Sequence, residues 1–237
     1  MKYNQKKSHA VILAGGKGTR LAPYTTTLPK PLVPVGDKPI LEIILKQLSS
    51  HNVKKIVIAV NHMAQLIEAF FGNGDRYGVD ISYSLEDKPL STVAPIKLID
   101  NLPDNFFVMN GDILTDIDYS DLFEKHMLSG ALLTVSTYKR ISHIDYGVID
   151  IDKETNNIKG FHEKPDKEFD VSMGIYVFNK KVLDYVPYNE AYGFDDLVYR
   201  LLELNIDINT YEHSGYWLDI GRPEDYAKAN NDVDDMV

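Results

Sequence analysis

The chain has 237 residues and a formal net charge of −10, because 35 Asp and Glu outnumber 25 Lys and Arg. An acidic chain has no general attraction for polyanions, so we expect neither a nucleic-acid partner nor a membrane partner. The sequence contains no cysteine, which excludes disulfides, thiolate nucleophiles and iron–sulfur clusters and fits a reducing cytoplasm.

The basic residues 1–8 are expected to form a flexible tail, followed by one domain over residues 9–237. In the first half, short β-branched runs alternate with stretches of helical periodicity, the pattern of βαβ units and a parallel sheet covered on both faces. The predicted strands are 10–13, 54–60, 81–84 and 106–109, and the predicted helices are 39–48, 63–71 and 93–99.

The second half predicts further strands joined by turns, and two more helices. The strands are 132–138, 147–151, 159–162 and 171–178, with a hairpin turn at Asn156-Asn157, and the helices are 195–204 and 223–230. No repeat or linker divides the chain. The expected fold is therefore a single mixed α/β domain.

A glycine-rich segment follows the first predicted strand. Gly15, Gly16 and Gly18 allow a tight turn whose backbone N–H groups can hold an anion. However, the dinucleotide fingerprint needs a glycine where Leu21 stands, and the Walker spacing is absent. A turn without a ligand explains these glycines equally well when they are considered alone.

Three cations and two carboxylates strengthen the case for a phosphate site. Arg20 lies in the glycine-rich loop, Lys30 lies between two prolines that are expected to hold it extended, and Lys164 precedes Pro165. Asp112 follows a buried strand, and Asp219 lies among apolar residues, where an unpaired carboxylate is costly. Positioned cations and carboxylates that hold a hard divalent cation are the parts of phosphoryl-group chemistry.

The order of the motifs resembles that of the sugar-1-phosphate nucleotidyltransferases over about residues 10–230. These motifs are LAGGKGTRL, PKPLVPVGDKPIL, MNGD, YGVI, EKP, GIYVF and GYWLDIGRPEDY. The resemblance implies a Rossmann-like, mostly parallel mixed sheet with helices on both faces. It also implies a Mg²⁺-dependent reaction in which an NTP and a sugar 1-phosphate give an NDP-sugar and pyrophosphate.

The resemblance also assigns roles to individual residues. Catalytic roles fall to Arg20, Lys30 and Lys164, and Mg²⁺ binding to Asp112 and Asp219. Nucleotide contacts are assigned to Leu13, Ala14, Gly15, Gly16, Gly18, Thr19, Arg20, Lys30, Leu90, Thr92 and Asp112. Contacts to the sugar phosphate are assigned to Tyr146, Gly147, Glu163, Lys164 and Ser172.

Two segments depart from the pattern of the family. Ser91, Ala94 and Pro95 alter a glycine-containing segment that lies against the base and sugar, and Ser172 stands where an asparagine is usual. The sequence is most similar to bacterial guanylyltransferases of mannose, heptose or amino-sugar 1-phosphates, which favours GTP and a product for capsule or lipopolysaccharide synthesis. Base, sugar and homo-oligomeric state stay open, and the alternative is a catalytically weak sugar-nucleotide sensor or regulatory subunit.

Overall fold

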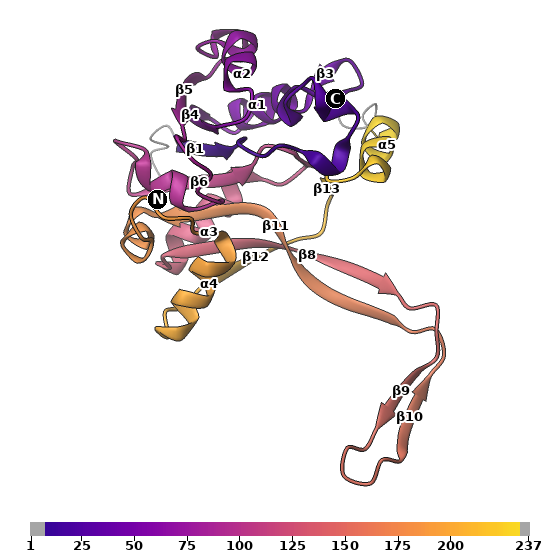
Figure 1. Ribbon diagram of the computed structural model, residues 1–237. Helices are drawn as coiled ribbons and strands as arrows, with labels where there is room; N and C mark the ends of the chain where they lie inside the picture. The colour runs from indigo at the N-terminus through magenta and orange to yellow at the C-terminus, as the bar shows by residue number, and fades with distance from the viewer. Residues whose placement is uncertain (1–7, 233–237) are drawn as a thin grey trace.

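The computed structural model describes residues 8–232, shown in Figure 1. The predicted tail lies outside the described residues except for Ser8, which was wrongly assigned to it. Ser8 is the first residue of strand β1 (Ser8–Leu13) because it pairs with Val53 in the parallel ladder between β1 and β4.

A seven-stranded sheet with the order β12-β8-β11-β6-β1-β4-β5 forms the centre of the molecule. Apart from β1, its strands are β4 (Val53–Val60), β5 (Asp80–Leu85), β6 (Asn105–Asn110), β8 (Leu133–His143), β11 (Asp166–Asn179) and β12 (Asn209–His213). Neighbouring strands are parallel except where β11 pairs with β6 and β8. The predicted mixed, mostly parallel sheet is confirmed.

Both faces of the sheet are covered. Side chains alternate along β1, so that Ala10 and Ile12 enter one apolar cluster and Val11 enters the other. The first cluster is covered by α1 (Ile40–Ser50), α2 (Ala64–Phe71), α3 (Tyr119–Ser129) and α5 (Pro223–Asp232). The second is covered by α4 (Phe194–Glu203) and the 3₁₀ segments Ala94–Leu98 and Lys180–Tyr185. None of the helices within residues 8–232 is long and apolar enough to cross a membrane.

Two helix predictions need correction. The segment 93–99 is not an α-helix but the short 3₁₀ helix Ala94–Leu98, because Pro95 lacks an N–H and the N–H groups of Val93 and Ala94 both donate to the carbonyl of Tyr192. Helix α3 was not predicted at all. It begins at Asp118, whose carboxylate accepts bonds from the N–H groups of Ser120 and Asp121.

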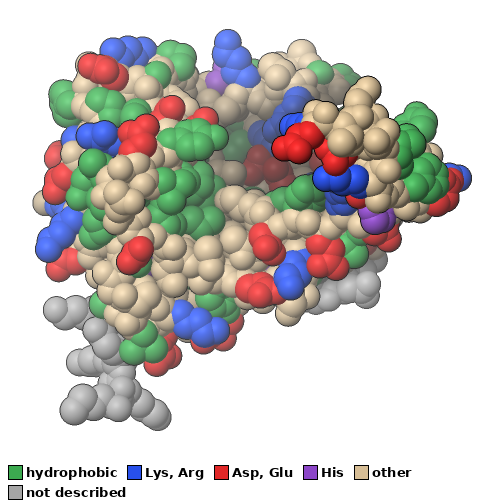
Figure 2. Space-filling view, turned by 90° about the horizontal axis from the view of Figure 1, so that it is seen from below, with side chains coloured by type: hydrophobic (Ala, Val, Ile, Leu, Met, Phe, Trp, Pro, Cys, Tyr) green, Lys and Arg blue, Asp and Glu red, His purple; other side chains and the backbone are tan. Residues whose placement is uncertain are grey.

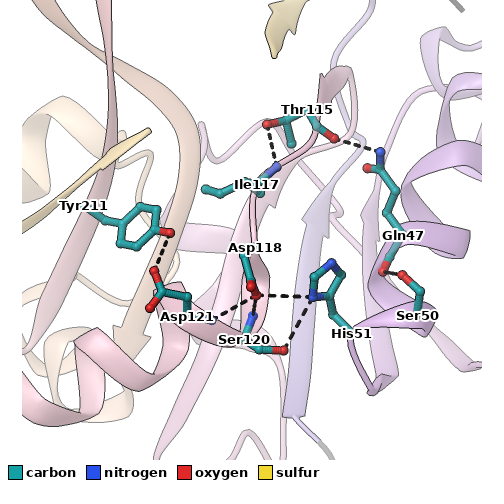
Figure 3. Close-up of polar contacts among 9 residues, drawn as sticks. All are labelled: Gln47, Ser50, His51, Thr115, Ile117, Asp118, Ser120, Asp121 and Tyr211. Carbon is teal, nitrogen blue, oxygen red and sulfur yellow. Dashed lines mark hydrogen bonds and ion pairs between the residues drawn. The ribbon is translucent and has the colours of Figure 1, made fainter. Parts of the chain in front are cut away.

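The connection before α3 is tied to its neighbours (Figure 3). The Gln47 side chain of α1 donates to the carbonyl of Thr115 at 2.8 Å, and His51 lies 3.5 Å from Asp118. Thr115 ends β7 (Ile113–Thr115), which pairs with β13 (Trp217–Asp219). Helix α1 therefore supports the small ladder that carries Asp219.

A long two-stranded arm projects from the sheet (Figure 1). We define the arm as residues 139–170. It consists of the outer parts of β8 and β11 and of a hairpin formed by β9 (Val148–Ile151) and β10 (Ile158–His162). The predicted hairpin is present, but its turn lies earlier and is longer than predicted, over residues 153–155, with Asn156 at a φ of 57° where the chain turns back to β10. The remaining ladder joins β2 (Pro34–Val35) to β3 (Lys38–Pro39).

Candidate active site

A cleft of about 450 Å³ lies where the parallel strands β1, β4, β5 and β6 end. Ligands of open parallel sheets bind at this edge, and the volume is that of a small-molecule site. Figure 2 shows a hollow in the face seen from below, with both basic and acidic side chains in it. Eight of the predicted site residues line the cleft: Leu13, Ala14, Gly15, Gly16, Lys30, Leu90, Thr92 and Asp112.

The glycine-rich loop forms one wall. Gly18 has a φ of 62°, and a Cβ atom there would lie 2.9 Å from the Thr25 methyl group, so glycine is required. The Thr25 hydroxyl donates to the Gly18 carbonyl at 2.8 Å. This bond turns the chain into the 3₁₀ segment Thr19–Leu21, which carries Arg20. Gly18, Thr19 and Arg20 therefore follow the wall of the cleft without lining it.

Lys30 forms an ion pair with Asp112, and both side chains are largely buried. The prediction that the flanking prolines hold Lys30 extended was wrong. Pro29 is extended, but Lys30 begins a 3₁₀ segment, since Leu32 and Val33 donate to the carbonyls of Pro29 and Lys30. The tight turn directs the ammonium group into the cleft beside the end of β6.

Asp219 lies next to Asp112, although the two are far apart in sequence. Asp219 ends β13, and the following N–H of Ile220 donates to the Asp112 carbonyl at 3.0 Å. Burial raises the pKa of the Asp219 carboxyl, and the charge of Asp112 raises it further, whereas Lys30 and Arg20 act in the opposite direction. The four groups thus belong to one electrostatic site.

One oxygen of each carboxylate has no partner among the described residues. These atoms, Asp112 Oδ1 and Asp219 Oδ1, are buried and accept no hydrogen bond. Two orphaned carboxylate oxygens fit a hard divalent cation such as Mg²⁺, which takes one or two carboxylates and completes its shell with water and phosphate. Residues 8–232 contain no group of three or more His, Asp or Glu side chains that could hold a metal.

The predicted sugar-phosphate residues on the arm are not brought to the cleft. Tyr146, Gly147, Glu163 and Lys164 lie in the connections between β8 and β9 and between β10 and β11, and none of them lines it. Packing alone explains why residue 147 is a glycine, because a Cβ atom there would lie 2.6 Å from the Phe161 ring. Lys164 adopts a φ of 44°, an uncommon conformation for a residue with a side chain. The roles of these residues stay predictions.

Ser172 lies nearer the sheet, at a break in the register between β11 and β8. Its hydroxyl is 3.1 Å from the Tyr176 hydroxyl and accepts a bond from the N–H of Gly174. It does not line the cleft, and its proposed contact with the sugar phosphate also stays a prediction.

Of the polar residues that line the cleft, five were not among the predicted site residues: Lys17, Asn61, Glu86, Ser91 and Asn110. Asn61 and Glu86 each directly follow a strand at the edge where the predicted site lies, and this position could have identified them from the sequence. Glu86 accepts the N–H of Leu90 at 3.0 Å, and burial raises the pKa of its carboxyl. Its other oxygen lies close to the backbone of Gly15, so that Gly15 and Glu86 form one wall.

Comparisons with known proteins agree with this geometry. The profile of the family described as Nucleotidyl transferase matches residues 9–236. A UTP–glucose-1-phosphate uridylyltransferase of Synechocystis is 35% identical over 93% of this chain, and a mannose-1-phosphate guanyltransferase of Yarrowia lipolytica is 36% identical over 92%. The chain spans 62% of the length of each of these two relatives.

A solved structure supports the same family. HddC from Yersinia pseudotuberculosis is 28% identical, with a TM-score of 0.74 over 95% of this chain and 99% of that chain. The same protein has been solved in complex with GMP-PN, with a TM-score of 0.71 to this chain. The predicted resemblance is confirmed, and the chain belongs to the nucleotidyl transferase family.

Proposed function

We propose that the protein transfers a nucleotidyl group from an NTP to a sugar 1-phosphate, giving an NDP-sugar and pyrophosphate. The observation that carries the proposal is the meeting of the glycine-rich loop, Lys30, Asp112, Asp219 and Arg20 at one edge of the sheet. Relatives named for uridylyl and guanylyl transfer to sugar 1-phosphates support the same class of reaction.

The residues of the site suit this chemistry. The attacking atom is a phosphate oxygen that is already ionised at neutral pH, so the reaction needs no general base. This oxygen bonds to the α-phosphorus of the NTP while the bond from that phosphorus to the bridging oxygen breaks, and pyrophosphate leaves with the bonding electrons. The barrier lies in the repulsion between two anions and in the charge that develops on pyrophosphate. Positioned cations such as Lys30 and Arg20 lower both.

Mg²⁺ is part of the proposal, with Asp112 and Asp219 as its ligands. Their orphaned oxygens support this assignment. When bound, the ion neutralises phosphate charge and fixes the orientation of the triphosphate. Lys30, which pairs with Asp112, lies where it can contact the same phosphates.

We further propose GTP as the donor, on the basis of Glu86. An ionised carboxylate only accepts hydrogen bonds. Guanine is the one common base whose N1–H and N2 amino donors lie side by side on the same edge, so it can bond both oxygens of a carboxylate. Uracil, thymine, cytosine and adenine each place an acceptor next to their donor. A half-buried carboxylate in the cleft therefore favours guanine.

The proposed substrates also suggest a place and a purpose. NTPs are abundant in the cytoplasm, so we propose that the protein acts there. NDP-sugars are donors for glycan assembly, which fits a role in capsule or lipopolysaccharide synthesis. The alternative, a sensor or regulatory subunit that binds nucleotide sugars without making them, would not need two neighbouring carboxylates that each keep one buried oxygen without a partner.

Pyrophosphate release separates an enzyme from a sensor. The protein is mixed with each NTP, Mg²⁺ and a panel of sugar 1-phosphates. We expect pyrophosphate only when a sugar 1-phosphate is present, and fastest with GTP. Binding of an NDP-sugar without pyrophosphate release in any combination would favour the sensor.

Replacing Glu86 by Gln tests the choice of base separately. The amide loses one acceptor, and a bidentate contact to a base is worth about 1–3 kcal/mol, so kcat/KM for GTP should fall by about 5-fold to 150-fold. Rates with pyrimidine NTPs should not fall. Asp87→Asn is the matched control, because it removes a carboxylate from the neighbouring, exposed position. An equal loss with all NTPs would contradict a role for Glu86 in reading the base.

A further inference from the structure

The first turn of helix α4 is capped by a residue of the cleft. The N-cap residue of α4 is Gly193, which has no side chain to accept a hydrogen bond. Instead, the N–H of Phe194 donates to the hydroxyl oxygen of Thr92, 102 positions earlier, at 2.9 Å. The first N–H groups of a helix have no partner within the helix, so this bond satisfies one of them. Because Thr92 lines the cleft, the cleft and α4 are directly joined.

Three backbone hydrogen bonds join the same two segments at Tyr192. The N–H of Tyr192 donates to the carbonyl of Leu90 at 3.0 Å. The carbonyl of Tyr192 accepts the N–H groups of Val93 and Ala94 at 3.0 and 3.1 Å. We name residues 192–194 the latch and residues 90–94 the wall. The latch therefore fixes the backbone of the wall over most of its length.

The wall in turn holds Glu86. Leu90 is buried, and while its carbonyl accepts the N–H of Tyr192, its own N–H donates to one oxygen of the Glu86 carboxylate at 3.0 Å. The other oxygen of this carboxylate lies close to the backbone of Gly15. The orientation of the carboxylate in the cleft thus depends on where the latch holds Leu90.

The ring of Phe194 fixes the latch to the central sheet. It stacks on the ring of Tyr176, with 4.0 Å between the ring centroids and 22° between the ring planes. Tyr176 is buried on β11, so it gives the latch a rigid support. Neither Tyr192 nor Phe194 lines the cleft. The latch can therefore act on a nucleotide in the cleft only through the wall.

We propose that the latch is a positioning element that sets the specificity for the base. It holds Leu90 where the Glu86 carboxylate keeps the orientation that accepts both donors of guanine. The inference rests on the proposed function and deepens its choice of GTP. It assigns a role in substrate selection to Phe194, which belongs to a helix outside the cleft.

Phe194→Leu tests this role, because leucine keeps the backbone N–H and an apolar side chain but removes the ring stack. The ratio of kcat/KM for GTP to kcat/KM for UTP should fall by about 5-fold to 10-fold, the lower part of the range for a lost bidentate contact. The control is Tyr199→Leu, the loss of an aromatic ring from the same helix where the side chain is 67% exposed, and it should leave the ratio unchanged. An equal loss of rate with every NTP would make Phe194 a merely structural residue and overturn the proposal, as would a wild type without a preference for GTP over UTP.

Amide hydrogen exchange followed by NMR tests the latch without any activity. In the nucleotide-free protein, Thr92→Val removes the acceptor for Phe194 and should speed exchange at the amides of Phe194, Val93 and Ala94 by at least about 10-fold, whereas Thr92→Ser keeps the hydroxyl and should not. Unchanged exchange in Thr92→Val overturns the proposal. A wild type that releases no pyrophosphate refutes the proposed function instead. In that case the ratio of the dissociation constants for GTP and UTP replaces the kinetic ratio, with the same expected change in Phe194→Leu.

Discussion

Replacing Asp219 by Asn is expected to stabilise the metal-free protein while abolishing its activity. The carboxyl is buried, one of its oxygens has no partner, and the charge of Asp112 raises its pKa. Close like charges repel by up to about 4 kcal/mol at an effective dielectric constant of 20. Lys30 and Arg20 act in the opposite direction and offset part of this repulsion. We therefore expect the free energy of unfolding to rise by about 1 kcal/mol.

The pH dependence of this gain has a defined sign. The folded-state pKa of Asp219 is raised above 3.8, so the folded protein holds the proton more tightly than the unfolded chain does. The ionised carboxylate therefore costs stability above the raised pKa, and the cost fades as the pH falls through it. The advantage of Asp219→Asn should be complete at neutral pH and should shrink as the pH approaches 3.8.

Urea unfolding in EDTA, at neutral pH and in mild acid, measures both effects. The same unfolding is then measured with Mg²⁺ added. A ligand at about 100 times its dissociation constant should stabilise wild type by about 2.7 kcal/mol, whereas the stability of Asp219→Asn should change little. A variant that is less stable than wild type without metal would refute the reasoning and make Asp219 a structural residue. Equal stabilisation of both proteins by Mg²⁺ would refute its role as a ligand.

Three other substitutions test single residues. Arg20→Lys should lower kcat several-fold or more, because an ammonium group cannot reproduce the bidentate contact of a guanidinium with phosphate; wild-type turnover would argue against that contact. Lys164→Ala should raise KM for the sugar 1-phosphate by an amount worth about 1.5–3 kcal/mol, with KM for the NTP unchanged. A higher KM for the NTP with KM for the sugar 1-phosphate unchanged would mean that Lys164 binds the nucleotide instead. Ser91→Gly should raise the free energy of unfolding by about 1 kcal/mol, since Ser91 has a φ of 67°. A loss of stability in urea would show that the Ser91 side chain compensates for the strain.

Sequence patterns predicted the parts of the fold that have strong periodicity. The βαβ half, the mostly parallel sheet and the meeting of Asp112 with the glycine-rich loop follow from buried strands that end in glycine and polar residues. Helix α3 was not predicted from the sequence, because its apolar residues lack clear helical spacing. Asp118 at its start and Gly130 after its end are nevertheless ordinary helix boundaries. Its position depends on tertiary contacts such as that of Tyr211 with Asp121.

Other features depend on the backbone in three dimensions. The left-handed conformation of Ser91 gives a physical reason for the glycine that the family usually has there, but a propensity scale does not reveal it. Glu86 could be recognised as a candidate only from the fold, because the order β1-β4-β5 brings the ends of β1 and β5 to the same edge of the sheet, where Glu86 lies beside Gly15. The extension of the arm away from the sheet was also not readable from strand patterns, because strand lengths do not fix where a hairpin points.

The most direct test of the account is to follow the phosphorus atoms of the reaction by ³¹P NMR. Wild-type protein, GTP, Mg²⁺ and mannose 1-phosphate or a related sugar 1-phosphate should give the resonances of a nucleotide sugar and of pyrophosphate in equal amounts. EDTA should stop the reaction and added Mg²⁺ should restore it, whereas Asp112→Asn and Asp219→Asn should stay inactive with Mg²⁺ present. Release of inorganic phosphate and GDP instead, or no change with any NTP and sugar 1-phosphate, would contradict nucleotidyl transfer at this site.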